Sequence, residues 1–324
     1  MLRKRVLLIL PALLVATACT QAKPNAAGTG SSVATTSAAT ASTPASSPSA
    51  TPTPTTSSAK PTPAAKPVHV SLLENDGAQY GVGMPIIAWF NVAPKDAHAF
   101  ARATKVTQNG YAVPGAWYFE QTSRPGQALE AHWRPQHYWL GHAQIHMDLP
   151  VKGLSAGPGL AYDDSLTLDM RTGPSIVSTV DAQSLQMKVS VDGKQYGVFP
   201  VSLGASNTPT SRGTKVIMEK GADISMRGPG YYDPHVQWTQ RLTYGGEYLH
   251  SAPWNVANLG VRSTSNGCTN LAPGVAKQLY NLMEIGDVVQ YPNANGPAMS
   301  LGAGYGDWNV PWTQWLTGGY LKTN

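Results

Sequence analysis

Short apolar runs separated by glycine, proline and asparagine make up the first ordered part of the chain, from residue 68 to about residue 173. Four of these runs have the length of β-strands, at residues 85–90, 115–119, 143–149 and 166–170. Their number and the turn residues between them predict a small β-sandwich. Because the segment has roughly 105 residues, its size is that of an immunoglobulin-like domain.

Strict alternation of apolar and polar residues follows from residue 185 to residue 191 and returns at Tyr196 and Val198. Asp192-Gly193 lies between the two stretches, and this dipeptide favours a tight turn with positive φ. The pattern predicts a β-hairpin, preceded by a strand over residues 176–180.

One segment has the spacing of a helix. Pro273 fits a first-turn position, Val275, Leu279 and Leu282 share one face, and Gly286 lies just past the end. A strand over residues 287–291 follows. We therefore predict an all-β protein, in which an immunoglobulin-like β-sandwich is followed by a second β-rich domain with one short helix.

The N-terminus predicts export. Three basic residues precede an apolar run over residues 6–15, which is too short to span a bilayer but is typical of a signal peptide, here residues 1–18. Ala16 to Cys19 resembles the lipobox of bacterial lipoproteins, which implies lipidation of Cys19 and an anchor on the outer face of the cell membrane. The alternative is a secreted protein cleaved after Ala18.

From Cys19 to residue 66 the chain is almost entirely serine, threonine, alanine, proline and glycine, which predicts a disordered tether that reaches toward the cell wall. The net charge of +5 comes from the first 66 residues, because the rest of the chain has 17 basic and 18 acidic residues. A protein that binds nucleic acid needs a concentrated basic surface. We therefore expect no nucleic-acid partner.

Cysteine usage gives the first indication of chemistry. The chain has two cysteines, and if Cys19 carries lipid, Cys268 is a lone thiol in the exported protein. The polar, glycine-containing segment around it lies just upstream of the predicted helix, where backbone N–H groups and the helix dipole favour a thiolate. A buried, inert cysteine is the alternative. His250, after a predicted strand over residues 247–249, is the candidate base for this thiol.

The residues around these two side chains, His250-Ser251-Ala252 and Ser265-Asn266-Gly267-Cys268-Thr269-Asn270, resemble the signature of the L,D-transpeptidases. These YkuD-type enzymes cross-link bacterial peptidoglycan. Residues 81–85 and 132–139 resemble the immunoglobulin-like domain of mycobacterial and related actinobacterial members. Residues 216–220, 231–232 and 307–312 resemble their catalytic and C-terminal portions.

The resemblance implies three domains after the tether. They are an immunoglobulin-like domain at 67–173, a YkuD-type β-sandwich catalytic domain at 174–294, and a Trp-rich extension at 295–324 that packs on the catalytic domain. No cofactor is expected.

The resemblance also implies roles for individual residues. Cys268 would attack the donor tetrapeptide stem and release D-Ala, and an acceptor stem would resolve the acyl-enzyme into a 3-3 cross-link. His250 would be the acid/base, oriented by the Ser251 carbonyl. Backbone N–H groups of Gly267 and Cys268, with the Tyr232 hydroxyl, would form the oxyanion hole. The substrate-pocket positions would be Met218, Tyr231, Trp254 and Asn270, and carbapenem β-lactams would acylate the site.

Asn266 departs from the family pattern, in which most members have histidine immediately before the Gly-Cys. Asparagine forms hydrogen bonds but cannot carry a positive charge. We expect Asn266 to fix the loop that presents Cys268 by hydrogen bonding. Two alternatives remain for the function: an L,D-carboxypeptidase that uses water as acceptor at the same site, and a cell-wall-binding protein with impaired catalysis.

Two other groups of residues carry weaker signals. His132, His137, His142 and His146 lie close together in the sequence, but their spacing matches no structural zinc site and Pro135 breaks any helix that would align them, so we expect no metal. Trp308, Trp312 and Trp315 could stack on a sugar. We favour aromatic packing against the catalytic domain instead.

Overall fold

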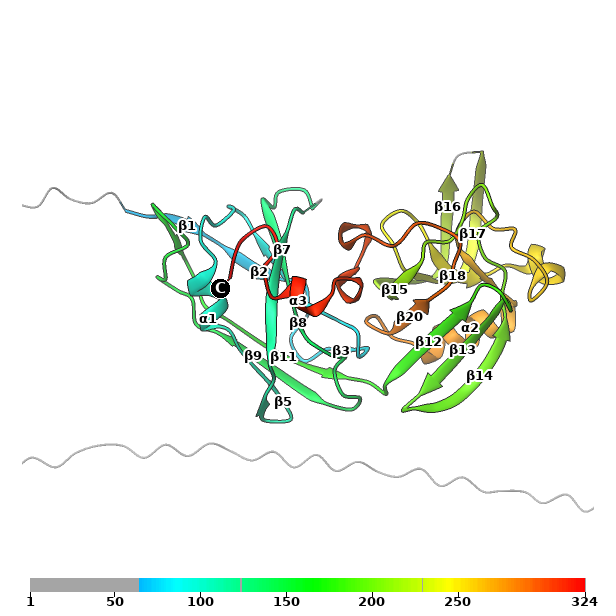
Figure 1. The fold of residues 1–324 in the computed structure, drawn as a ribbon, viewed down its shortest axis with the longest axis horizontal. Coiled ribbons are helices and arrows are strands. Elements are labelled where there is room, and N and C mark those ends of the chain that lie inside the picture. Colours follow the sequence, from blue (N-terminus) through cyan, green and yellow to red (C-terminus); the bar gives the residue numbers. More distant parts are fainter. Residues whose placement is uncertain (1–63, 123, 229, 324) are drawn as a thin grey trace, which may run out of the picture. The chain divides into compact units, whose positions relative to one another are not determined.

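The computed structural model describes residues 64–122, 124–228 and 230–323 (Figure 1). The predicted signal peptide, Cys19 and nearly all of the predicted tether lie outside these residues. Within the described ranges, no helix has the length and apolar character required to cross a membrane.

The first domain is the predicted β-sandwich, and the four strands expected from its apolar runs are confirmed. Its four-stranded sheet has the order β2 (Val70–Leu72), β4 (Ile86–Phe90), β8 (Leu129–Pro135), β7 (Gly115–Glu120). Its five-stranded sheet has the order β3 (Gln79–Tyr80), β11 (Leu166–Thr172), β9 (Gln144–Leu149), β5 (Lys105–Gln108), β6 (Tyr111–Ala112). A pair formed by β1 (Lys66–Val68) and β10 (Leu160–Tyr162) and a short helix α1 (His98–Ala103) complete the domain. Aromatic rings centred on Phe100 fill the core.

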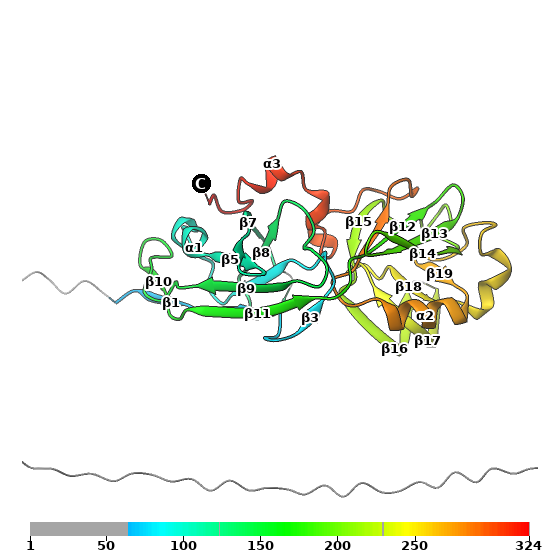
Figure 2. The same ribbon diagram turned by 90° about the horizontal axis from the view of Figure 1, so that it is seen from below.

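The second domain also has two sheets (Figure 2). Its five-stranded sheet has the order β14 (Lys194–Pro200), β13 (Gln186–Val191), β12 (Ile176–Asp181), β20 (Val288–Tyr291), β15 (Gly213–Val216). Its four-stranded sheet has the order β16 (Glu219–Gly228), β17 (Tyr231–Arg241), β18 (Tyr248–Ser251), β19 (Thr269–Leu271). The 3₁₀ helix η1 (Pro253–Asn258) follows β18, and the helix α2 (Pro273–Leu282) follows β19.

The predicted hairpin and helix of this domain are confirmed. Asp192 and Gly193 both have positive φ, at 49° and 76°, as the tight turn between β13 and β14 requires. Helix α2 begins at Pro273 and buries Leu279 against the domain core. The long hairpin of β16 and β17 was not predicted, because only four of its 21 strand residues are buried and the sequence therefore shows no clear apolar alternation.

Two glycines in the first domain let it approach the second domain closely. The Gly81 N–H donates to the Ile285 carbonyl at 2.7 Å, and the Gly83 N–H donates to the Gly286 carbonyl at 2.8 Å. A Cβ atom at Gly81 would lie 2.1 Å from the backbone nitrogen of Asp287, so a side chain has no room there. The contact extends the core of the first domain to Val288 of β20.

The C-terminal extension contacts both domains, whereas we expected it to pack on the catalytic domain. It contains η2 (Leu301–Ala303), η3 (Asp307–Asn309) and α3 (Trp312–Trp315). Its first part does lie on the second domain, where the Met299 N–H donates to the Arg212 carbonyl at 2.7 Å. Its last part pairs with β7 of the first domain, where Phe119 donates to Gly318 and accepts from Tyr320.

The expected packing of the three tryptophans on the catalytic domain is therefore wrong. They surround Arg134 of β8 in the first domain, with ring centroids 4.7, 5.3 and 4.2 Å from its guanidinium carbon for Trp308, Trp312 and Trp315. The guanidinium also donates to the Val310 carbonyl at 2.9 Å. Aromatic faces attract a partly desolvated cation, which explains why the rings gather at Arg134.

Candidate active site

A cavity of about 430 Å³ brings most of the predicted site residues together. Of the residues expected from the sequence, its lining includes Tyr231, Tyr232, His250, Trp254, Asn266, Cys268 and Asn270. These residues come from β17, β18, the segment after β18, the loop that leads into β19, and β19 itself.

Parallel pairing of β18 with β19 sets the relative positions of the base and the nucleophile. His250 is directly opposite Asn270 in this ladder, and Leu249 is opposite Thr269. Cys268 lies one residue before β19, and its side chain and that of His250 both line the cavity. The two side chains are distant in sequence but adjacent in the fold because of this register.

His250 has a fixed tautomer. Its Nδ1 lies 2.8 Å from the Ser251 carbonyl, which can only accept, so Nδ1 carries the proton. Its Nε2 is then an acceptor, and Asn270 Nδ2 donates to it at 2.8 Å. Burial lowers the pKa of His250 below its usual 6.5, while the hydrogen bond to Ser251 opposes that shift. The ring is therefore a neutral base near pH 7.

The Asn270 amide is itself held in one orientation. Asn255 Nδ2 donates to Asn270 Oδ1 at 2.8 Å, which leaves the Asn270 NH₂ group toward His250. Asn255 Oδ1 in turn accepts from Asn258 Nδ2 at 2.6 Å and from Thr264 Oγ1 at 2.9 Å. Asn255, Asn258 and Thr264 were not found from the sequence, because nothing in their spacing marks them as neighbours.

Cys268 is buried and protonated in this state. Only 6% of its surface is exposed, and its thiol donates to the Gly246 carbonyl at 3.4 Å. Burial raises the pKa of the thiol to about 12. The expectation that its surroundings favour a thiolate is not met, because β19 separates Cys268 from the start of α2 and the Gly246 carbonyl accepts the proton. Among the described residues, no hydrogen bond joins Cys268 to His250.

Ser265, not Asn266, fixes the loop that presents Cys268. Ser265 Oγ donates to the Cys268 carbonyl at 2.6 Å and accepts from the Gly267 N–H at 3.2 Å. Thr210 Oγ1 holds the Gly267 carbonyl at 2.9 Å. Asn266 is exposed, and its side chain makes no hydrogen bond to any residue that the structure describes. The hydroxyl groups of Ser265 and Thr210 do what we expected of Asn266.

Gly267 has φ of 108°, in the left-handed region that favours glycine. Because its N–H donates to Ser265 Oγ, it is not free to bind an oxyanion in this state. The expected pair of backbone donors is thereby reduced to the N–H of Cys268 unless the loop shifts.

The two tyrosines differ in their relation to the thiol. Tyr232 is 58% exposed, and the Arg227 guanidinium carbon lies 4.8 Å from its ring centroid. Tyr231 is less exposed, and burial and the nearby Cys268 raise the pKa of its hydroxyl. Tyr231 is thus the more buried of the two cavity tyrosines, and it lies near the nucleophile.

Met218 lies outside the residues that line the cavity. It lies between β15 and β16, where it packs against the core of the first domain and near Gly304 of the extension. Met226, near the end of β16, lines the cavity in its place. Trp254 lies at the cavity with its ring centroid 5.9 Å from that of His250.

The four histidines near residue 140 do not form one site. His142 contacts Asp192 at 3.0 Å and His146 contacts Asp169 at 2.8 Å, both at the surface. His132 is buried, with Nδ1 2.7 Å from Asp307 Oδ1 of the C-terminal extension.

The Nε2 atom of His132 faces two carboxylates. It lies 3.5 Å from Glu120 and 3.7 Å from Glu130, so this group of three has metal-ligand types within reach of one another. Although burial lowers the pKa of His132, the Asp307, Glu120 and Glu130 carboxylates raise it to about 10. The protonated ring thus supplies the cation that these acids need.

Comparison with known proteins agrees with this geometry. A family model for the YkuD L,D-transpeptidase catalytic domain matches residues 175–290. Residues 175–290 are an L,D-transpeptidase catalytic domain of the YkuD family. A bacterial Ig domain model matches residues 24–155 and so begins within the segment that we interpreted as a tether. The domain boundaries remain predictions.

Mycobacterial L,D-transpeptidases are among the proteins to which the chain is similar. L,D-transpeptidase 2 of Mycobacterium tuberculosis is 30% identical over 266 residues, which cover 78% of this chain and 64% of the relative's length. The structure of M. tuberculosis L,D-transpeptidase 3 with a faropenem-derived adduct has a TM-score of 0.56 at 26% identity and covers 69% of this chain and 97% of that one. LD transpeptidase LdtMt1 in complex with imipenem has a TM-score of 0.57 at 24% identity, covers 71% of this chain and 100% of that one, and supports the fold alone.

Proposed function

We propose that the protein is a peptidoglycan L,D-transpeptidase that forms 3-3 cross-links through an acyl-enzyme on Cys268. The observation that carries the proposal is the single cavity that holds both a thiol and a neutral histidine of fixed tautomer, within a YkuD domain. The chain spans 64% of the length of L,D-transpeptidase 2, so transpeptidase activity is a proposal for this chain.

The first step forms the acyl-enzyme. The thiol leaves the Gly246 carbonyl, and His250 Nε2 takes its proton as Asn270 gives way. The sulfur then forms a bond to the carbonyl carbon of the third stem residue of a donor tetrapeptide. As the amide C–N bond breaks, His250 returns the proton to the nitrogen, and D-Ala leaves.

The second step resolves the thioester. The side-chain amine of an acceptor stem attacks the same carbonyl carbon, His250 removes a proton from the amine, and the sulfur leaves as the thiol. In both steps the oxyanion would be bound by the Cys268 N–H and the Tyr231 hydroxyl, which replaces Tyr232 in this role. Asn266, Trp254 and Asn270 border the space where the stems would lie.

We also propose that the protein acts outside the cytoplasm, anchored to the membrane by lipid on Cys19. The support is the signal-like segment and the lipobox resemblance, together with the need to reach peptidoglycan. The proposed partners are donor and acceptor stems and, as inhibitors, carbapenem β-lactams. Imipenem and faropenem appear with the structural relatives described above.

An L,D-carboxypeptidase would use the same Cys268 and His250 with water in place of the amine, and an impaired wall-binding protein would use neither. The test is incubation of the full chain with a purified disaccharide-tetrapeptide, followed by mass spectrometry. A cross-linked dimer supports the transpeptidase. Tripeptide alone would assign the carboxypeptidase, and unchanged substrate would leave only a binding role.

A further inference from the structure

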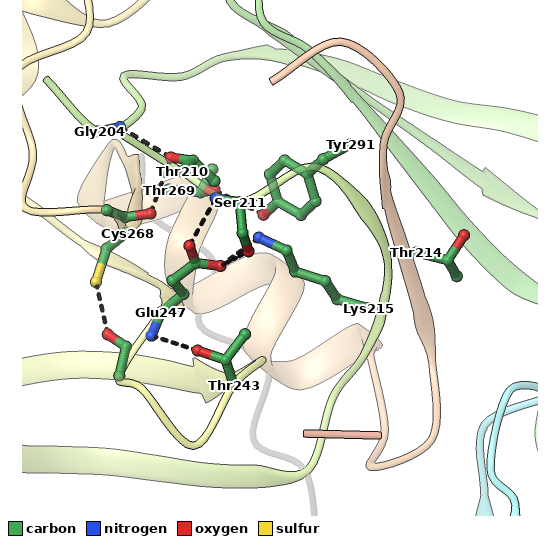
Figure 3. Close-up of polar contacts among 12 residues, drawn as sticks. Gly204, Thr210, Ser211, Thr214, Lys215, Thr243, Glu247, Cys268, Thr269 and Tyr291 are labelled. Carbon is green, nitrogen blue, oxygen red and sulfur yellow. Dashed lines mark hydrogen bonds and ion pairs between the residues drawn. The ribbon is translucent and has the colours of Figure 1, made fainter. Parts of the chain in front are cut away.

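A lysine is buried behind the nucleophile, and the mechanism above does not use it. Lys215 of β15 has no exposed side-chain surface. Its ammonium group donates to Glu247 Oε2 and lies 3.9 Å from the ring centroid of Tyr291 (Figure 3). The pair lies within the YkuD domain, beneath the loop that holds Cys268.

Covalent and hydrogen-bonded links connect the pair to Cys268 from two sides. Glu247 directly follows Gly246, whose carbonyl accepts the thiol proton at 3.4 Å. On the other side, Tyr291 shares a hydrogen bond of 2.7 Å with the hydroxyl of Thr269, the residue after Cys268. A shift of either charged side chain would therefore change the hydrogen bonds next to the Cys268 thiol.

The Glu247 carboxylate is held rigidly. It accepts from the Ser211 N–H at 2.7 Å and from Ser211 Oγ at 2.8 Å in addition to Lys215. Thr243 Oγ1 accepts from the Glu247 N–H at 3.0 Å and so fixes the peptide that carries the Gly246 carbonyl. These contacts place the acceptor of the thiol proton.

Stability alone does not account for the pair. Burial of two charges costs several kcal/mol, and apolar residues of similar volume often serve as well or better. Burial lowers the pKa of Lys215 although Glu247 opposes the shift, which shows the cost at this site. A role at the neighbouring thiol accounts for its presence.

Glu247 and Lys215 are the two charged groups that act on the thiol pKa. The other titratable groups that line the cavity or face the thiol are Asp233 and Tyr231 of β17, Tyr248 and His250 of β18, and Tyr291 of β20. The pKa values of these tyrosines are raised and that of His250 is lowered, each chiefly by burial, so all four are neutral near pH 7. Glu247 raises the thiol pKa and Lys215 lowers it.

We propose that Lys215 and Glu247 are a positioning pair for Cys268, which holds the Gly246 carbonyl beside the thiol and balances two opposite charges next to it. The inference rests on the proposed role of Cys268 as the nucleophile. As a consequence, loss of Lys215 should lower the reactivity of the thiol and loss of Glu247 should raise it. Loss of both should change the reactivity little.

The test is the rate of Cys268 alkylation by iodoacetamide across pH 7–11 in the full chain, followed by peptide mass spectrometry. Lys215→Met leaves Glu247 alone beside the thiol, so we expect about tenfold slower alkylation at pH 8, equivalent to one pKa unit. Glu247→Gln leaves the cation and should give about tenfold faster alkylation. The double variant keeps the hydrogen bond from the backbone N–H of residue 247 to Thr243 and has neither charge beside the thiol, so it should react at nearly the wild-type rate.

Lys220→Met is the matched control, since Lys220 also lies over a tyrosine ring, 4.7 Å from the Tyr280 centroid, but bonds the Met283 carbonyl. Its alkylation rate should not change. Equal or same-direction shifts in the two single variants would overturn the proposal. If thermal melting shows that one single variant does not fold, the other is compared with the double variant, and equal rates overturn it.

The proposed function has a separate readout. Intact-mass measurement of the wild type with imipenem reports acylation, whereas alkylation needs no substrate. If the wild type is not acylated but the two single variants still shift the alkylation rate in opposite directions, the proposed function is refuted and the role of the Lys215–Glu247 pair stands. If the wild type is acylated but the variants show no such shifts, the role of the pair is refuted and the proposed function stands.

Discussion

Asn270 donates from Nδ2 to Nε2 of His250 at 2.8 Å, and it thereby occupies the ring nitrogen that must receive the proton of Cys268. The thiol meanwhile donates to the Gly246 carbonyl. Base and nucleophile each have another partner, so the structure is that of a resting site. Substrate binding must exchange both hydrogen bonds for the one between sulfur and imidazole.

Replacement of the nucleophile should abolish acylation without unfolding the domain. Cys268→Ala removes one sulfur atom from a buried position, and His250→Gln keeps a polar side chain that cannot act as a base. We expect no imipenem adduct with the first variant and at least about 100-fold slower acylation with the second. Intact-mass spectrometry measures both. An adduct that persists in Cys268→Ala would refute the assignment of the nucleophile.

Asn270→Asp should shift the pH dependence of acylation. A carboxylate at Nε2 would favour the charged imidazolium and raise the pKa of His250, which burial now holds below 6.5. Wild-type acylation should therefore decline only as the pH falls below 6.5. In Asn270→Asp the decline should begin at least about one unit higher.

Asn270→Ala provides the comparison for that experiment. It removes the hydrogen bond without adding charge, so the plateau rate should fall while the midpoint stays low. If Asn270→Asp leaves the midpoint of the imipenem acylation profile unchanged, Asn270 does not control the protonation of His250.

Ser265→Ala should impair the site more than Asn266→Ala. Ser265 makes two hydrogen bonds within the loop, and their loss from a buried position should cost about 1–3 kcal/mol of folding free energy. Because the loop then holds Cys268 less firmly, we expect imipenem acylation to slow by about tenfold or more, which corresponds to about 1.4 kcal/mol of activation free energy. Asn266→Ala should stay within about threefold of the wild type. The reverse order of the two rates would restore the role that we first expected of Asn266.

Asp307→Asn should weaken the contact between the first domain and the extension. It breaks the ion pair to His132, and we expect a loss of about 3 kcal/mol at pH 7, at the low end for a buried pair because Glu120 and Glu130 remain nearby. Urea unfolding measures the loss. Asp169→Asn, at the exposed pair with His146, is the control and should cost less than about 1 kcal/mol.

The same pair predicts how stability depends on pH. The pKa of His132 is raised from 6.5 to about 10, so its contribution is complete below pH 6.5 and is lost as the pH rises through about 10. Burial raises the pKa of Glu120 to about 7 and that of Glu74 to about 8, which also favours the folded protein at low pH. Unfolding free energy should fall between pH 6 and pH 10. A flat profile would contradict this assignment of charges.

Sequence patterns predicted the elements with one buried face and missed the contacts between distant segments. The apolar alternation around Asp192-Gly193 predicted a hairpin, and the shared face of Val275 and Leu279 predicted a helix. No local pattern predicted the hydrogen bonds of Ser265 and Asn255, because the role of a single polar residue depends on a partner that only the fold brings near. The resemblance identified Cys268 and His250, but it placed Met218 in the substrate pocket, whereas Met226 lines the cavity and Met218 packs against the first domain.

The C-terminal extension also determines when the first domain can form all of its contacts during synthesis. Asp307 follows His132 by 175 residues, and Val310 follows Arg134 by 176. As the ribosome releases the first domain, its buried imidazole and guanidinium have no partners from the extension, and the edge of β7 has no Gly319 to pair with. The first domain is therefore translated first but acquires its last contacts only after the catalytic domain and the C-terminal extension have been synthesised.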